Sequence, residues 1–171
     1  MTSQPNRAAQ RRARVRDNLW NQAKDYWPQP NSVGWCKLSK ITPLALLILE
    51  EAVECKGATR VYLDLLTRNF NEGIVERINE SEAALLSGFS GASKERGWKK
   101  CILLLDKFGF IRIAKVGSDK LGVIFIIDPV EVIKNLHTQG VVSDELWNLF
   151  IFKCADSGIP LTKIAITEKD K

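Results

Sequence analysis

Residues 79–127, NESEAALLSGFSGASKERGWKKCILLLDKFGFIRIAKVGSDKLGVIFII, decide the fold. They begin with a helix of only two turns, which Asn79 or Ser81 can cap and Gly88 can end. After a glycine-rich turn, a longer helix is predicted from Ser93 to Lys107. This part of the sequence therefore predicts two consecutive helices joined by a tight turn.

The remainder of this stretch predicts a β-hairpin. Residues 110–116 alternate apolar and polar side chains, as a half-buried strand does, and residues 121–127 form a second apolar run. Residues 117–120, between the two runs, are typical of a turn. On the preceding helix, the apolar residues that recur at helical spacing predict a buried face, which consists of Trp98, Ile102 and Leu105.

Further elements are predicted on both sides of this stretch. Helical periodicity and start and stop signals indicate helices at 44–56, 59–70, 130–137 and 143–157, and a brief strand at 74–78. The first of these helices is expected to bury Leu44, Leu47, Ile48, Ala52 and Cys55. The last is expected to bury Leu146, Leu149, Phe150 and Cys154.

Length and composition favour one globular body with extensions. The chain has 171 residues, of which 45% are hydrophobic, and a formal net charge of +5. No apolar run approaches the roughly 18 residues that a membrane span needs, and the first residues lack the apolar stretch of a secretory signal. We therefore expect a cytoplasmic protein without a membrane partner.

The sequence offers no set of residues for catalysis or metal binding. Four cysteines lie tens of residues apart without a CxxC pair, and His137 is the single histidine. We expect reduced core thiols, no metal site and no cofactor. His137 has no partner at catalytic spacing, so an enzyme is not expected.

The order helix, helix, short strand, short helix, tight turn, longer basic helix and hairpin resembles the winged helix-turn-helix family. The resemblance covers residues 44–127, and its tightest part is Glu80 to Ile127, where Phe108-Gly109-Phe110-Ile111 leads from the longer helix into the hairpin. It implies a mainly α fold with a small β-hairpin (α+β). The domains are then a basic N-terminal arm and connector (1–43), the winged helix (44–127) and a C-terminal helical extension (128–171).

The resemblance also implies a function. In that family the helix corresponding to 93–107 enters the major groove of DNA, and the hairpin corresponding to 110–127, called the wing, reaches the backbone or the minor groove. This implies a non-enzymatic protein that binds double-stranded DNA, in a bacterium or a mobile element. Its role would be transcriptional regulation or plasmid replication.

The distribution of charge favours the same function. Residues 1–27 carry six basic and two acidic side chains, a density that a polyanion satisfies most easily. On the longer helix, Arg96 and Lys100 should face solvent, and Gly97 would permit a close approach of the backbone to DNA. The predicted DNA-binding residues are Ser90, Ser93, Lys94, Arg96, Gly97, Lys100, Arg112, Lys115, Lys120, Arg7, Arg11, Arg12, Arg14 and Arg16.

Two other interpretations stay open at this point. Cations on a helix face are often merely solvated, and Glu95 lies among them. The chain can also be a winged-helix module for protein–protein interaction without DNA binding. Residues 146–152 are more apolar than one helix face needs, which favours a partner surface or a homodimer formed through the C-terminal helices.

Overall fold

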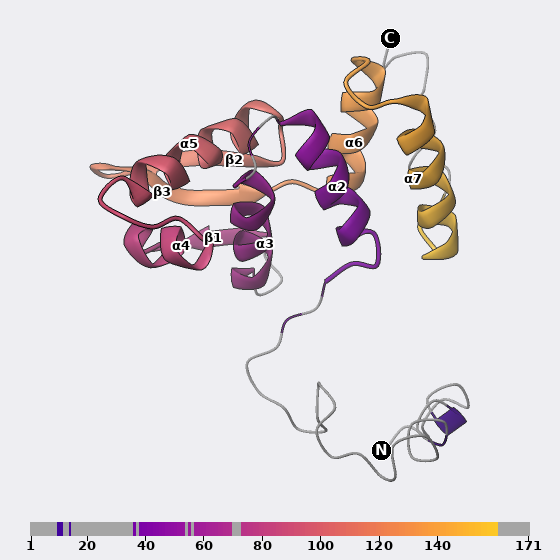
Figure 1. Cartoon of the computed structure of the whole chain (residues 1–171), viewed down its shortest axis with the longest axis horizontal. Helices are drawn as coiled ribbons and strands as arrows, with labels where there is room; N and C mark the ends of the chain where they lie inside the picture. Colours follow the sequence, from indigo (N-terminus) through magenta and orange to yellow (C-terminus); the bar gives the residue numbers. More distant parts are fainter. Residues whose placement is uncertain are drawn as a thin grey trace. The chain divides into compact units, whose positions relative to one another are not determined.

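The structure is a computed structural model that describes residues 10, 11, 14, 36, 38–53, 55, 57–69 and 73–160. The chain divides into two units, residues 1–36 and residues 37–171. The helices and strands given below belong to the second unit, which combines α-helices with a small antiparallel sheet (Figure 1).

Six helices and three strands form within the described part of this second unit. The helices are α2 (Thr42–Ala52), α3 (Ala58–Arg68), α4 (Glu80–Leu86), α5 (Lys94–Lys107), α6 (Pro129–Thr138) and α7 (Asp144–Asp156). The strands are β1 (Ile74–Glu76), β2 (Ile111–Val116) and β3 (Asp119–Ile126). The predicted helices and strands therefore form, with ends shifted by a few residues, and the fold is mixed α+β.

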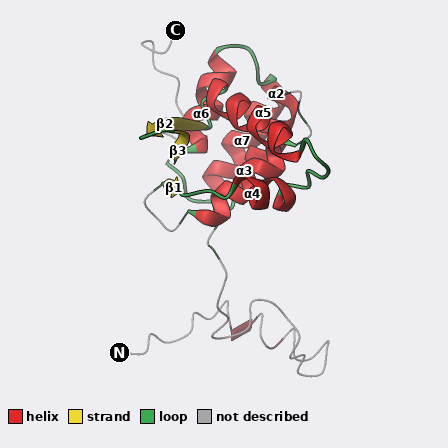
Figure 2. Ribbon diagram, turned by 90° about the vertical axis from the view of Figure 1, so that its left-hand side faces the viewer, coloured by secondary structure: helices red, strands yellow, loops and turns green. Residues whose placement is uncertain are grey.

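The hairpin is part of a three-stranded sheet, which goes beyond the prediction. The strand order is β1-β3-β2, with both pairs antiparallel. Across the sheet Val75 pairs with Ile124, which pairs with Ile113, and this row faces the core. The strands lie together along one side of the helices (Figure 2).

The core lies between the sheet and the helices. Trp98, Ile102 and Leu105 of α5 are completely buried, as their spacing predicts. Helix α5 packs against α3, α4 and β2. Burial of these large apolar side chains removes several hundred Å² of surface from water, so the hydrophobic effect anchors α5 from Trp98 to Leu105.

The prediction of the buried face was wrong for one residue of α2. Leu47 is 42% exposed, whereas its neighbour Leu49 is completely buried. Residues 44–49 are all apolar, so the sequence pattern does not fix which side of the helix faces the core. The structure selects the phase that places Ala45, Ile48 and Leu49 in the core.

Helix α7 also differs from its prediction. Phe150 and Cys154 are buried as expected, but Leu149 is 43% exposed and Trp147 takes the inner position. The Trp147 ring stacks on His137 of α6, with centroids 4.4 Å apart. This aromatic contact between α6 and α7 holds Trp147 on the inner side of α7. The apolar pattern of α7 alone does not predict such a contact.

None of the helices in the described part is both long enough and apolar enough to span a membrane.

Candidate nucleic-acid interface

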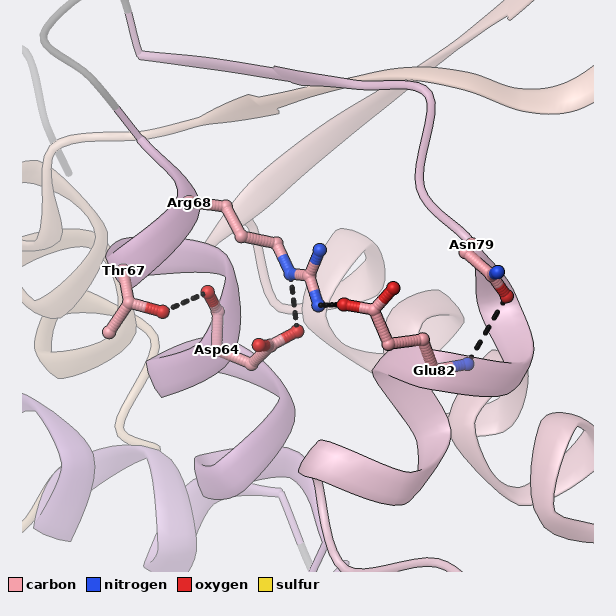
Figure 3. Close-up of polar contacts among 5 residues, drawn as sticks. All are labelled: Asp64, Thr67, Arg68, Asn79 and Glu82. Atoms are coloured by element: carbon pink, nitrogen blue, oxygen red, sulfur yellow. Dashed lines mark hydrogen bonds and ion pairs between the residues drawn. The ribbon is translucent and has the colours of Figure 1, made fainter. Parts of the chain in front are cut away.

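Helix α4 and the turn after it are held in place by local polar contacts. The Asn79 side chain accepts a hydrogen bond from the Glu82 backbone N–H at 3.2 Å, so Asn79 is the N-cap of α4. Arg68 of α3 donates to Asp64 at 2.8 Å and reaches Glu82 of α4 at 3.4 Å (Figure 3). These contacts tie the beginning of α4 to the end of α3.

Gly88 ends α4, as the sequence predicts. Its φ of 81° lies in the left-handed region, which glycine adopts without steric cost. The Phe89 N–H then donates to the Ala84 carbonyl at 2.9 Å, a bond that closes the helix end. The chain leaves α4 in a fixed direction toward α5.

The ring of Phe89 lies between two glycines of other segments. A Cβ added to Gly57, just before α3, would lie 2.5 Å from Phe89 Cζ. A Cβ added to Gly97 of α5 would lie 2.8 Å from Phe89 Cδ1. Packing against Phe89 is therefore sufficient to explain why residue 97 is a glycine. The close approach of the Gly97 backbone to DNA stays a prediction.

The outward face of α5 carries exposed cations. Arg96 and Lys100 are both exposed, and neither forms an ion pair with a residue that the structure describes. Lys99, by contrast, lies 2.6 Å from Glu80 of α4. Lys94 is half-buried. Arg96 and Lys100 are therefore the cations of α5 best placed to meet an external anion.

Two serines lie at the beginning of α5. Ser90 and Ser93 are exposed. Ser93 occupies the N-cap position, yet its hydroxyl makes no capping hydrogen bond. A hydroxyl in this position, next to the positive end of the helix dipole, is suited to donate to a phosphate oxygen.

The hairpin brings two more cations to the same end of this unit. Lys115 and Lys120 are exposed and flank the β2–β3 turn. Helix α5 leads into the corner at residues 108–110 and β2 leads back out of it, and each is about 20 Å long. The beginning of α5 and the tip of the hairpin consequently lie toward the same end (Figure 1).

Arg112 lies at the other end of the hairpin. Its Nη1 is 3.5 Å from the carbonyl oxygens of Asp106 and Ile111. Together with Lys107 it lines a hollow of about 320 Å³ beside α6. The structure thus separates Arg112 from Lys115 and Lys120, although all three were predicted as contacts of one wing.

The N-terminal arm contributes little to the described structure. Arg11 and Arg14 are exposed. Arg7, Arg12 and Arg16 lie outside the described residues. The DNA contact of this arm stays a prediction that rests on its sequence alone.

Two side-chain contacts were missed by sequence reasoning. His137 Nε2 lies 3.2 Å from Asp144 Oδ1, so the histidine does have a carboxylate partner. Its stacking on Trp147 gives this pair a structural role between α6 and α7. The sulfurs of Cys55 and Cys101 lie 3.0 Å apart. No group of three or more metal-binding side chains occurs among the residues that the structure describes.

No family model matches the chain, and no curated protein and no solved structure matches it either.

Proposed function

We propose that this protein is a winged helix-turn-helix protein that binds double-stranded DNA. Helix α5 would lie in the major groove, and the β2–β3 hairpin would act as the wing along the backbone. The succession of α4, a tight turn, α5 and a hairpin supports this proposal. A helix with side chains fits a major groove about 12 Å wide.

One observation carries the proposal. Arg96 and Lys100 on α5, and Lys115 and Lys120 on the hairpin, are exposed cations toward one end of the unit and have no ion pairs with described residues. An ordinary solvated surface intersperses charges of both signs, whereas phosphate binding requires cations that are free to be neutralised. Exposed Glu95 on α5 and exposed Asp119 next to Lys120 are acidic residues that interrupt this surface.

The proposal predicts a steep dependence of DNA affinity on salt. Each neutralised phosphate contributes about −0.9 to the slope of log affinity against log salt, so four lysine and arginine contacts give a slope of about −4. Fluorescence anisotropy with labelled duplex across a salt series measures this slope. A slope near zero would refute the proposal.

Charge variants locate the interface. Arg96→Ala/Lys100→Ala should weaken binding and reduce the slope by about 2 if both side chains contact phosphates. If one of them reads a base edge, sequence preference at one base pair should relax instead, which selection from a random duplex pool detects.

The matched control is Lys40→Ala/Lys153→Ala. It removes the same charge from exposed positions outside α5 and the hairpin. This control should retain nearly the full affinity and slope. Equal losses in the two double variants would mean that net charge, and not the proposed surface, attracts DNA.

A second function is supported by the outer face of α7. Phe152 is 64% exposed and Leu149 is 43% exposed, which is unusual for large apolar side chains on one helix. This favours an interaction module or a homodimer formed through the C-terminal helices. Sedimentation equilibrium of the chain and of Phe152→Glu tests it, since a dimer should dissociate on substitution, and a monomer at high concentration would exclude the homodimer.

A further inference from the structure

Two cysteines that are far apart in the sequence lie in contact in the fold. Cys55 is in the segment between α2 and α3, and Cys101 is in the middle of α5. Their Sγ atoms are 3.0 Å apart. Cys101 is completely buried, whereas Cys55 is partly exposed. Cys55 is therefore the more accessible residue of the pair.

The surroundings of Cys55 stabilise its thiolate. Burial raises the pKa of Cys55, but the neighbouring Cys101 thiol, the nearby backbone N–H groups of Gly57 and Ala58, and the positive charge of Lys100 together lower it more. The net pKa lies below the ordinary value. The two N–H groups belong to the beginning of α3, where the helix dipole favours negative charge.

Cys101 has the opposite environment. Burial and the neighbouring Cys55 sulfur raise the pKa of Cys101 to about 12. It therefore keeps its proton and donates it to the Cys55 sulfur when that sulfur is a thiolate. One thiol is activated and accessible, and the other is protonated, protected and within reach. This division of roles is the one that a two-cysteine redox pair requires.

We propose that Cys55 and Cys101 form a reversible dithiol–disulfide site that is oxidised by hydrogen peroxide or an organic hydroperoxide. Cys55 is the attacking thiolate, and Cys101 is the resolving thiol. The disulfide joins the α2–α3 connection to α5. The inference does not depend on DNA binding, because its readouts concern the thiols alone.

The reaction proceeds in two balanced steps. The Cys55 thiolate attacks a peroxide oxygen, so that an S–O bond forms, the O–O bond breaks, and the released hydroxide or alkoxide takes up a proton. The Cys101 sulfur then attacks the Cys55 sulfenic acid, an S–S bond forms, the S–O bond breaks, and the departing hydroxide leaves as water with the Cys101 proton. With hydrogen peroxide, two thiols lose two electrons and one peroxide becomes two waters.

The test uses the full chain with its natural cysteines. Reduced protein is treated with hydrogen peroxide, remaining thiols are alkylated, and peptides are mapped by mass spectrometry without reduction. The expected result is a cross-linked peptide pair containing Cys55 and Cys101, which dithiothreitol converts back to thiols. The variant Cys36→Ser should give the same pair at the same rate.

Two results would overturn the proposal. The first is oxidation of Cys55 to sulfinic or sulfonic acid while Cys101 stays a free thiol. The second is a faster reaction at Cys36 than at Cys55, because the proposed activation would then be absent.

Variants separate the two roles. In Cys101→Ala, Cys55 should be trapped by dimedone as a sulfenic acid, with complete loss of the cross-linked peptide. In Cys55→Ala, Cys101 should resist oxidation. If either variant fails to fold, iodoacetamide labelling of the unaltered chain against pH decides the point. Cys55 should be alkylated at lower pH than an ordinary cysteine thiol, and alkylation only at higher pH would refute the proposal.

Discussion

A methyl group added to Gly97 tests the packing that holds α5. An alanine Cβ at this position would lie 2.8 Å and 2.9 Å from two carbons of the Phe89 ring, well inside ordinary van der Waals contact. The same edge of the ring also lies close to Gly57, so a movement of the ring would disturb both contacts. Gly97→Ala should therefore introduce strain, although alanine is the better helix former.

The magnitude follows from two opposing effects. Overpacking of this kind costs about 1–3 kcal/mol, and replacing glycine by alanine inside a helix contributes about 1 kcal/mol of stability. Gly97→Ala should thus destabilise the protein by about 1 kcal/mol. In a Phe89→Ala background the ring is gone, so the same substitution should stabilise by about 1 kcal/mol. The effect of Gly97→Ala on stability therefore changes sign when the Phe89 ring is removed. This change corresponds to a coupling energy of about 2 kcal/mol between the two positions.

Urea unfolding of the four proteins in this double-mutant cycle provides the measurement, with stability taken from midpoints at an unchanged m value. Gly57→Ala is a second arm, because its Cβ would meet the same ring at 2.5 Å. If Gly97→Ala stabilised the protein equally with and without Phe89, the ring would not fill this space. The glycine would then need another reason, such as contact with a ligand.

Three further predictions concern the scaffold. Burial raises the pKa of Tyr62 above its ordinary value of 10.0. The folded state then retains a proton that the unfolded state releases, so the free energy of unfolding should fall as pH rises above about 10. Tyr62→Phe should make this fall smaller in thermal unfolding scans. Asn79→Ala should cost about 1 kcal/mol through the lost helix cap, whereas Ser81→Ala should cost much less in the same urea assay. Oxidation of Cys55 and Cys101, which are 46 positions apart, should raise the free energy of unfolding by up to about 4 kcal/mol, and an unchanged urea midpoint would show that strain in the native state cancels the gain.

The sequence was informative wherever apolar and polar residues alternate clearly. On α5 residues 101–105 are also all apolar, but the charged residues on both sides of Trp98 indicate which face is buried, and Trp98, Ile102 and Leu105 are all buried. Residues 44–49 offer no such contrast, since every one is apolar, and Leu47 was assigned to the core although it is exposed. Local periodicity identifies an element more reliably than it fixes the rotation of that element.

Contacts between remote segments could not be predicted in this way. Nothing in the spacing of Cys55 and Cys101 indicates that their sulfurs meet, because the contact arises from the packing of α3 against α5. The position of Arg112 could be predicted from the sequence, since this residue follows the corner after α5 by only two residues. Arg112 lies within the predicted wing, at its base, and its contact with DNA stays a prediction.

The inward contacts of α5 determine where its cations point. Gly97, Trp98 and Cys101 face neighbouring segments within the same two turns that carry Arg96 and Lys100. Successive residues of an α-helix are related by a fixed rotation, so anchoring the inner side chains also fixes the direction of the outer ones. Stability and DNA affinity should consequently be separable. Arg96→Ala should reduce affinity at an unchanged unfolding midpoint, because its side chain is exposed, whereas substitutions on the inner face should alter stability first and affinity only by displacing the helix.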